Sequence, residues 1–378
     1  MSRNDNYERL CSFYELLGTI RDRDAFKEAL QQTVSSEDLD VFFLLPAAGN
    51  ISFSKLEKKS KMPPDALREK LKWLSAEGFI LAYESKGEYA YERGHFIFMT
   101  EQQVRKEEES PQRTTFARFF DALIEGDLAD ALSTKTPAYR VLPAEPAIKA
   151  SSSLGTIQMD VEVQDPSGTL PIDIITEMVR KDGSLIGVGE CFCRKARRIV
   201  GKGCTHPLER CFVFNEAAQT LIENGFARKI DFGETVEILK NCEALGLVHN
   251  VDNCGGQIRS LCNCCPCCCV VMRSVMRGET NAGAPSRYVV DFSQEKCSGC
   301  EACVSRCPVG AWAVVDGEAV VDTDRCIGCG LCVTACPAGA VRMVLREEIE
   351  KIPKSLPKHQ NKVIREVAFA YVKRKLLG

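Results

Sequence analysis

The chain has 378 residues, of which 45% are hydrophobic, and a formal net charge of −3. This length suggests about two to four domains with cores large enough to fold without disulfide bonds. The sequence contains no run of about 18 uninterrupted apolar residues, so we expect no transmembrane helix. No secretory signal is visible, and the near-neutral charge gives no general attraction to nucleic acid. We therefore expect a cytoplasmic protein whose 21 cysteines bind metal rather than form disulfides.

The first hundred or so residues predict helices followed by a winged-helix domain. Residues 1–35 carry apolar side chains near helical spacing. Pro63-Pro64-Asp65 is typical of a helix start, and Gly78 of a helix end. The expected winged-helix elements are helices at 36–45, after 50–54 and from 64 to 77, and strands at 79–83 and 89–91 around a wing at 85–87.

The sequence allows two roles for this predicted winged helix, binding DNA or binding another protein. In DNA-binding relatives of the fold the third helix enters the major groove, and a locally basic surface would suit that role. However, residues 1–110 hold 16 Lys and Arg against 20 Asp and Glu, a net charge of −4, which fits phosphate poorly. We therefore favour protein contacts over binding to nucleic acid. The basic residues are Lys55, Lys58, Lys59, Lys61, Arg68, Lys70 and Lys72.

Between residues 101 and 250 the pattern predicts short elements that lead to a cysteine-rich region. The charged stretch 105–109 reads as a solvated face or linker, and residues 136–170 read as irregular or extended because they are rich in Pro, Ser and Gly. Residues 184–189 read as a buried strand that delivers Glu190 and Cys191 to a metal region. The remaining predicted elements are helices around 116–124, at 171–180, at 216–224 and at 234–245.

The densest group of cysteines, which we call the cysteine run, is Cys262-Asn263-Cys264-Cys265-Pro266-Cys267-Cys268-Cys269. Six neighbouring thiols cannot all face one core, so we interpret them as ligands of iron–sulfur clusters or of structural zinc. An upstream set of cysteines supports a metal site, whereas Cys11 and Cys242 lie in predicted helices and are expected in the core. The upstream set is Cys191, Cys193, Cys204 and Cys211.

The strongest motif is Cys297-x2-Cys300-x2-Cys303-x3-Cys307-Pro308, which recurs as Cys326-x2-Cys329-x2-Cys332-x3-Cys336-Pro337. The two copies lie 29 residues apart (326 − 297) and have the same inner spacing. Zinc sites usually show two separated cysteine pairs, so this repeat favours iron–sulfur clusters. Residues 313–321, between the copies, predict a hairpin with an Asp-Gly turn.

This repeat resembles the bacterial two-cluster ferredoxin over about 60 residues, from 288 to 346. The resemblance implies two [4Fe–4S] clusters, each held by three cysteines of one copy and the fourth of the other. It also implies that Gly299, Gly328 and Gly330 let the backbone approach the clusters. The implied ligands are Cys297, Cys300, Cys303 and Cys336 for one cluster, and Cys326, Cys329, Cys332 and Cys307 for the other.

The wider order of motifs resembles a larger family of 4Fe–4S proteins found mainly in anaerobic bacteria and archaea. That order is Cys-x-Cys-Arg, Gly-Cys-x-x-Pro, Cys, the cysteine run and the two ferredoxin repeats. It covers about residues 138–345 and begins near Tyr139-Arg140-Val141-Leu142-Pro143. The resemblance implies redox work and no particular reaction.

The number of cysteines predicts one or two clusters beyond the ferredoxin pair. Successive residues of an extended chain point to opposite sides, so Cys264 and Cys265 could serve two clusters. The alternatives are a structural zinc or a thiol pair that cycles through a disulfide. One further [4Fe–4S] cluster would use Cys193, Cys204, Cys211 and Cys264, and a second would use Cys191, Cys262 and others among Cys265, Cys267, Cys268 and Cys269.

Four basic residues follow the first of these cysteines. They either offset the negative charge of a thiolate-ligated cluster or form an exposed basic loop. His206 could ligate or hydrogen-bond a cluster, although a histidine that caps its own turn is the simpler interpretation. The tail at 361–378 has a helical pattern with basic residues, which suits a docking helix better than a membrane surface. The four basic residues are Arg194, Lys195, Arg197 and Arg198.

Together these patterns predict a modular α+β protein that transfers electrons inside the cell to a partner redox protein. The alternatives are a redox-sensing winged-helix regulator, and a reductase or oxidoreductase component whose middle cluster has an open iron. No Gly-x-Gly-x-x-Gly after a strand and no P-loop is present, so donor and acceptor are expected to be other proteins. The expected parts are 1–110 (helices and winged helix), 111–170 (helix and irregular linker), 171–285 (cysteine-rich iron–sulfur domain), 286–346 (βαββαβ-type ferredoxin domain) and 347–378 (helical tail).

Overall fold

The computed structural model divides the chain into two compact units. Unit 1 comprises Met1–Ala131, Leu185–Lys229 and Val367–Gly378, and unit 2 comprises Leu132–Ser184 and Ile230–Glu366. The cysteine-rich segment that we expected as one domain, 171–285, is therefore divided between the units. The structure describes residues 5–15, 20, 22–127, 135–153, 176, 184–255, 258–278, 282–347, 352–356, 358–360, 362–363, 365–366 and 369.

Aromatic side chains form the core of the first part of unit 1. Phe26 is fully buried, and its ring lies edge-on or tilted against four other rings, which stabilises the core beyond the area that is buried. The centroid distances from Phe26 are 5.1–6.3 Å to Tyr14, Phe96, Phe116 and Phe119. The helices are α1 (Asn6–Tyr14), α2 (Arg23–Thr33), α6 (Phe96–Arg105) and α7 (Pro111–Ala122), with a π-helical turn at Leu123–Asp127.

The first strands of unit 1 form a three-stranded antiparallel sheet in the order β1-β3-β2. Lys86 and Gly87, both with positive φ, make the tight turn between β2 and β3 where the sequence predicted a wing. This order of elements is the one that a winged-helix domain requires, and the fold assignment stays a prediction. The elements are α3 (Ser36–Leu44), β1 (Asn50–Ser52), α4 (Phe53–Lys59), α5 (Pro64–Ala76), β2 (Ile80–Ser85) and β3 (Glu88–Arg93).

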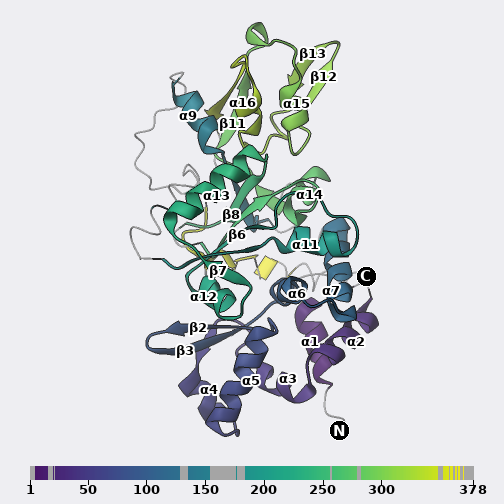
Figure 1. Cartoon of the computed structure of the whole chain (residues 1–378), viewed down its shortest axis with the longest axis vertical. Helices are drawn as coiled ribbons and strands as arrows, with labels where there is room; N and C mark the ends of the chain where they lie inside the picture. Colours follow the sequence, from purple (N-terminus) through teal and green to yellow (C-terminus); the bar gives the residue numbers. More distant parts are fainter. Residues whose placement is uncertain are drawn as a thin grey trace. The chain divides into compact units, whose positions relative to one another are not determined.

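The second part of unit 1, residues 185–229, packs on this sheet. Its helix α12 lies along β2 (Figure 1), where the Thr220 hydroxyl donates to the Ala82 carbonyl at 2.8 Å. The Glu84 amide donates to the side chain of Gln219 at 3.0 Å. The hairpin is thus held by the segment that carries the upstream cysteines. The elements are β5 (Ile186–Glu190), α11 (Phe192–Ile199), β6 (Glu209–Phe214), α12 (Asn215–Glu223) and β7 (Ala227–Lys229), paired antiparallel in the order β6-β5-β7.

The strands that precede the ferredoxin repeats in unit 2 run in the order β10-β4-β8-β9. β9 pairs antiparallel with β8, and this register places Val248 opposite Cys264 and Asn250 opposite Cys262. Cys262 and Cys264 therefore point to one face of β9, and Asn263 points to the other. The elements are β4 (Tyr139–Leu142), α9 (Glu145–Ser153), α13 (Phe232–Ala244), β8 (Val248–Asp252), β9 (Ser260–Cys264), α14 (Val270–Met276) and β10 (Gly283–Ala284).

The two cysteine repeats fold into a strand, a helix and a strand each. The first strand pairs antiparallel with the last, β11 with β14, and β12 with β13 forms the hairpin between the repeats. Asp316 and Gly317 have positive φ, as the predicted Asp-Gly turn requires. The elements are β11 (Tyr288–Phe292), a 3-10 turn (Gln294–Lys296), α15 (Ala302–Arg306), β12 (Trp312–Val315), β13 (Glu318–Val321), α16 (Leu331–Ala335) and β14 (Val341–Leu345).

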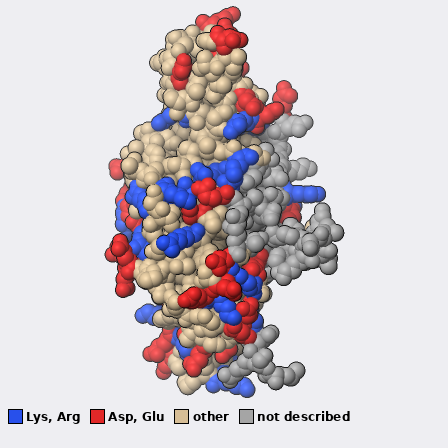
Figure 2. All heavy atoms as spheres, turned by 90° about the vertical axis from the view of Figure 1, so that its right-hand side faces the viewer, with Lys and Arg blue, Asp and Glu red and all other residues tan. Residues whose placement is uncertain are grey.

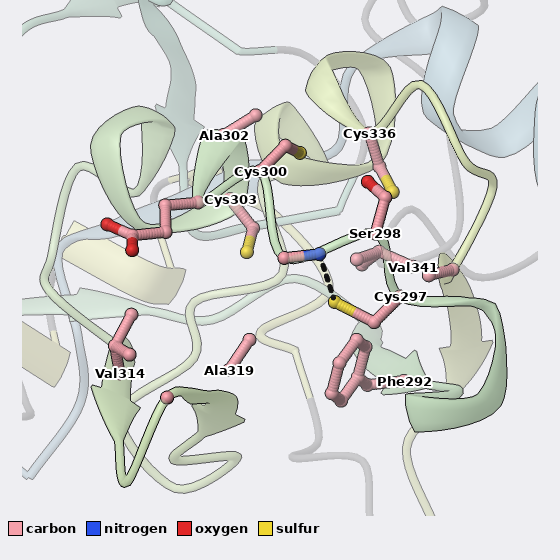
Figure 3. A pocket seen from close by; sticks show the side chains of 14 residues that line it. Phe292, Cys297, Ser298, Cys300, Ala302, Cys303, Val314, Ala319, Cys336 and Val341 are labelled. Carbon is pink, nitrogen blue, oxygen red and sulfur yellow. Dashed lines mark hydrogen bonds between the residues drawn. The ribbon is translucent and has the colours of Figure 1, made fainter.

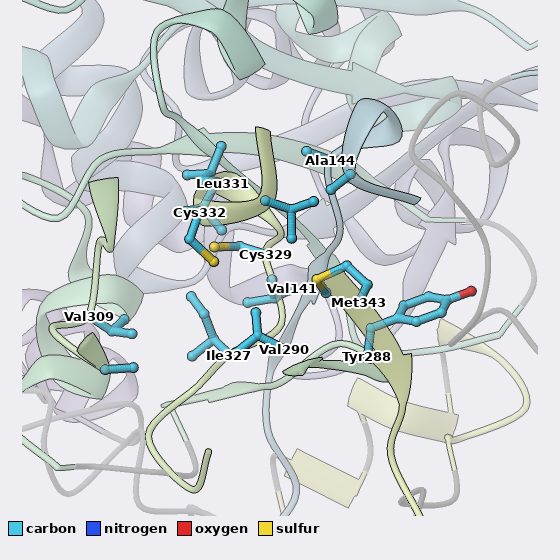
Figure 4. Packing of buried hydrophobic residues seen from close by; sticks show 14 of the residues in the cluster. Val141, Ala144, Tyr288, Val290, Val309, Ile327, Cys329, Leu331, Cys332 and Met343 are labelled. Carbon is cyan, nitrogen blue, oxygen red and sulfur yellow. The ribbon is translucent and has the colours of Figure 1, made fainter. Parts of the chain in front are cut away.

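Helix α9 differs from the expectation that residues 136–170 are irregular or extended, whereas strand β4 agrees with it. The Ala144 amide, just before α9, donates to the Cys329 carbonyl at 3.0 Å, and the Met343 amide donates to the Ser151 hydroxyl at 2.8 Å. Figure 4 shows Ala144 and Met343 in the same buried cluster of side chains. A short helix rich in Ala and Ser has little stability alone, so packing against the ferredoxin repeats stabilises it.

The mixed helix and strand content makes the chain an α+β protein, as the sequence predicted. Among the described residues, no helix combines the length and the apolar character that crossing a bilayer demands. Apart from Thr176, the helix predicted at 171–180 lies outside the described residues, as does most of the tail at 361–378. Those two expectations stay predictions.

The aromatic core gives a first testable prediction. Phe26→Ala should lower the free energy of unfolding by about 3–5 kcal/mol, because a buried ring is removed and a cavity is left. Trp73→Ala removes a larger ring that is 37% exposed in the same unit, and should cost less than about 1.5 kcal/mol. Urea titration followed by circular dichroism measures both values. Equal losses would contradict the placement of Phe26 at the centre of the core.

Candidate metal centre

The thiols that the ferredoxin resemblance assigns to one cluster surround a single pocket. The Gly299 amide donates to the Cys297 sulfur at 3.4 Å, which stabilises the thiolate form that binds iron. Burial raises the pKa of Cys303, and the nearby thiols of Cys297 and Cys336 raise it further. Cys300 is exposed at the rim. The pocket lining includes Cys297, Cys300, Cys303 and Cys336, with Phe292 and Ala319 (Figure 3).

The second set of ferredoxin thiols is more deeply buried (Figure 4). Burial raises the pKa of Cys329 well above its ordinary value and that of Cys332 to about 12, and the thiols of Cys326 and Cys307 add to both shifts. The Ala311 amide donates to the Cys307 sulfur at 3.2 Å. Cys307 therefore lies with the cysteines of the other repeat, just as Cys336 lies with Cys297 and Cys303 of the first. The crossed ligand sets, as an assignment of iron ligands, stay a prediction.

Glycines allow the chain to turn around these thiols, for two different reasons. A Cβ atom at Gly328, where φ is +68°, would lie 2.0 Å from the Tyr288 carbonyl oxygen. A Cβ atom at Gly330 would lie 2.6 Å from that of Ala147. At Gly299, by contrast, nothing lies within 4 Å and only the positive φ of +70° favours glycine. At positions 328 and 330 the space is thus needed for the chain's own packing.

In unit 1, three of the four upstream cysteines gather where β5 leads into α11. The upstream group is Cys191, Cys193 and Cys211. Hydrogen bonds from the thiols of Cys193 and Cys211, with the charge of Arg194, lower the pKa of Cys191 although it is buried. A thiol that ionises this readily is a good metal ligand at neutral pH. Cys204 lies in the loop that follows α11, and its carbonyl accepts from Arg198 at 2.9 Å.

Of the two interpretations left open for the basic residues after Cys193, the exposed loop does not fit, because these residues lie on a helix and three of them are buried. Arg194, Lys195 and Arg197 lie in α11 and are 0%, 8% and 6% exposed. Arg197 pairs with Asp121 at 2.5 Å, and Lys195 pairs with Glu190. Glu190 therefore has Lys195 as an ion-pair partner. Of the three buried cations, Arg194 acts on the thiol of Cys191, whose pKa its charge helps to lower, whereas Lys195 and Arg197 are paired with carboxylates.

The cysteine run divides into two groups of three thiols within unit 2. The strand group is Cys262, Cys264 and Cys269: the thiols of Cys262 and Cys269 contact Cys264 and, together with burial, raise its pKa. The turn group is Cys265, Cys267 and Cys268, whose sulfur atoms all lie within 4.8 Å of one another. Neighbouring thiols and then burial raise the pKa of Cys268 far above its ordinary value. Cys264 and Cys265 thus join different groups, as the alternation of side chains predicted.

The two cysteines that we expected in the core are there. Cys11 and Cys242 are both 0% exposed, and burial raises the pKa of Cys11 to about 11. Cys254 was not placed by the sequence reasoning. Burial, and to a lesser extent the nearby charge of Asp252, raises the pKa of Cys254 to about 12.

Sequence reasoning missed a buried polar network beside the cysteine run. His249 on β8 is 1% exposed, its Nδ1 lies 2.6 Å from Oδ1 of Asn263, and its Nε2 lies 3.3 Å from Oε1 of Glu243. Arg306, which precedes Cys307, donates to the Glu243 carbonyl at 3.0 Å. The network joins β8, β9, α13 and α15. Its only signal in the sequence was two polar residues in apolar strands, His249 and Asn263, which the strand register makes neighbours. Glu243 and Arg306 lie on helices and join the network through tertiary packing.

Comparison with known proteins supports the ferredoxin part of the site. Residues 290–312 and 319–342 match the family described as the 4Fe-4S binding domain. These two segments contain all eight cysteines of the repeated motif. No curated protein and no solved structure matches the chain. The chain therefore contains a ferredoxin-type, 4Fe–4S-binding segment, and its many other cysteines indicate iron–sulfur electron transfer.

The environments of the ferredoxin thiols predict how the cluster-free, folded chain reacts with iodoacetamide. Cys300 is exposed, and hydrogen bonds to its sulfur, mainly from the Ala302 amide, lower its pKa. Burial raises the pKa of Cys329. When the pH is below the pKa of a thiol, raising that pKa by one unit lowers the thiolate fraction about tenfold. At pH 7 Cys300 should be alkylated at least about tenfold faster than Cys329, as measured by peptide mass spectrometry.

The control for this prediction is the same reaction in denaturant. There the two environments are lost, so the two cysteines should react at similar rates. Equal rates in the folded chain would show that Cys329 is not buried as described.

Proposed function

We propose that the chain transfers electrons through two ferredoxin-type [4Fe–4S] clusters and at least one further cluster to a partner redox protein. The observation that supports this best lies inside unit 2. The strand group packs in the same hydrophobic cluster of side chains as the ferredoxin thiols Cys303, Cys329 and Cys332. Because these cysteines share one buried cluster of side chains, clusters bound to them would lie close to one another. Electrons can then move among them without a nucleotide or a flavin.

The chain's own residues account for the binding of the two ferredoxin clusters. When bound, a [4Fe–4S] cluster accepts and returns an electron. Three cysteines of one tight loop and the crossing cysteine of the other repeat supply its thiolates. The amides of Gly299 and Ala311 donate to the sulfurs of Cys297 and Cys307, and such hydrogen bonds tune the reduction potential. Because one set is buried and the other reaches the surface at Cys300, we expect two different potentials.

The exposed edge of the first thiol set is where we place the contact with a partner protein. Cys300 is exposed, and the β12–β13 hairpin beside the pocket exposes Val314, Val315 and Val320 by 40%, 51% and 42%. A small apolar surface next to a redox centre suits the brief contacts of electron-transfer complexes. Electrons would enter or leave the chain here.

We place the further cluster on the strand group, with its fourth ligand from outside that group. The ligand set expected from the sequence, Cys193, Cys204, Cys211 and Cys264, draws on both units. The strand group instead lies wholly in unit 2, beside the ferredoxin thiols. The upstream group, with its readily ionised Cys191, is the candidate for a second additional cluster.

The winged-helix part supports a role in protein contacts better than a role in regulation through DNA. Helix α12 covers β2, and the Asn224 side chain donates to the Ser75 carbonyl of α5 at 3.0 Å. Of the basic residues, Lys70 is already paired with Asp38 at 2.5 Å. On the face drawn in Figure 2, basic and acidic side chains are intermixed. A DNA-binding surface needs a continuous basic patch.

Serine variants of the crossing cysteines test the ligand sets. Cys307→Ser and Cys329→Ser should remove the same EPR signal of the reduced protein, and Cys336→Ser and Cys300→Ser should remove the other. Each variant should lose about four irons per chain. Cys242→Ser is the matched control, because that cysteine is buried outside every thiol group. Loss of the Cys300 signal in Cys307→Ser would contradict the crossed arrangement.

Iron and acid-labile sulfide analysis of protein purified without oxygen tests the further cluster. We expect about twelve or more irons per chain, with a third EPR signal that disappears in Cys262→Ser. Eight irons, all accounted for by the ferredoxin variants, would contradict the further cluster and leave only the ferredoxin pair.

A further inference from the structure

The turn group differs in geometry from every other set of thiols described above. Its three cysteines lie in one tight turn between β9 and α14, closed by a hydrogen bond from the Cys269 amide to the Cys265 carbonyl at 3.1 Å. Cys265 and Cys268 are 1% and 0% exposed, and Cys267 is half-buried. The turn thus directs three sulfurs inward at one point.

The sulfur separations fit a single tetrahedral metal ion. A Zn–S bond of about 2.3 Å at the tetrahedral angle separates two thiolates by roughly 3.8 Å. The sulfurs of Cys267 and Cys268 lie 3.8 Å apart, and no pair in the group exceeds 4.8 Å. In a cubane each thiolate binds a different iron, so its ligands stand further apart than ligands of one shared ion.

The ferredoxin thiols provide an internal comparison. They occur in the same unit and match a 4Fe–4S-binding family, so they show the spacing that this chain uses for cubanes. Among the residues that the structure describes, no three of them gather as closely as the turn group. The buried Cys265 and Cys268 also lie outside the hydrophobic cluster that joins the strand group to the ferredoxin thiols. The turn group is therefore distinct in both spacing and surroundings.

We propose that Cys265, Cys267 and Cys268 bind one Zn²⁺ ion, separate from the iron–sulfur clusters. Cys265 and Cys268 have the Cys-x2-Cys spacing of zinc sites, and thiolates are ligands that zinc prefers. The fourth position is filled from outside these three residues, by a side chain or by water. Zn²⁺ is not redox-active, so this ion would not take part in electron transfer. It fixes the end of β9 and the start of α14, and so holds Cys264 and Cys269 of the strand group in place.

Metal analysis of the full-length chain, purified without oxygen, tests this proposal. We expect about one zinc per chain in addition to iron. Cys267→Ser should lower zinc to less than about 0.2 per chain and leave the ferredoxin EPR signals unchanged. Cys262→Ser is the matched control from the strand group, and it should lose iron but keep its zinc. Cys267 is chosen because it is the most exposed of the three, so its variant is the one best tolerated by the fold.

A second measurement covers the case in which the serine variant does not fold. Wild-type chain produced with cobalt in place of zinc should show the strong visible bands of a tetrahedral cobalt–thiolate site. Absence of zinc from the wild type, zinc retained in Cys267→Ser, or a single iron in place of zinc would overturn the proposal. The proposal fails separately from the proposed function: twelve irons without zinc refutes only the zinc site, and eight irons with one zinc refutes only the further cluster.

Discussion

Each ferredoxin cluster needs four thiolates at the corners of one small volume, and no short piece of chain supplies four. The three cysteines of each loop approach from one side, and the fourth must come from another segment. The predicted crossing of Cys307 and Cys336 would meet that need, and the paired outer strands β11 and β14 bring the two repeats together. The Ala144 amide before α9 donates to the Cys329 carbonyl, and the absence of a Cβ atom at Gly328 leaves room for the Tyr288 carbonyl.

A second consequence of crowding thiols is electrostatic. Thiols that touch in a buried site resist ionising together, which is why the pKa of Cys264 and of Cys268 is raised. A bound cation reverses this cost. In the upstream group the pKa of Cys191 is lowered instead, first by hydrogen bonds from the thiols of Cys193 and Cys211 and then by the charge of the buried Arg194.

Within unit 1, the N-terminal helices and strands pack against the segment that carries the upstream cysteines. Helix α12 comes from the same segment as the upstream cysteines and covers β2 of the predicted winged helix. Arg197 of α11 pairs with Asp121, at the end of α7. Within unit 1, a change in the upstream group therefore has a direct structural route to the helices before it. These contacts support the proposed role of the predicted winged helix in protein contacts.

The sequence by itself determined the α+β class, the ferredoxin repeat with its eight cysteines, the Asp-Gly hairpin and the buried places of Cys11 and Cys242. These features depend on local spacing and periodicity, which a sequence records directly. Only the tertiary structure decided that the cysteine-rich segment belongs to two units, and that the cysteine run sorts into a strand group and a turn group. It also decided that Arg194, Lys195 and Arg197 are buried. Such outcomes depend on strand register and on contacts between distant segments, and no local pattern carries that information.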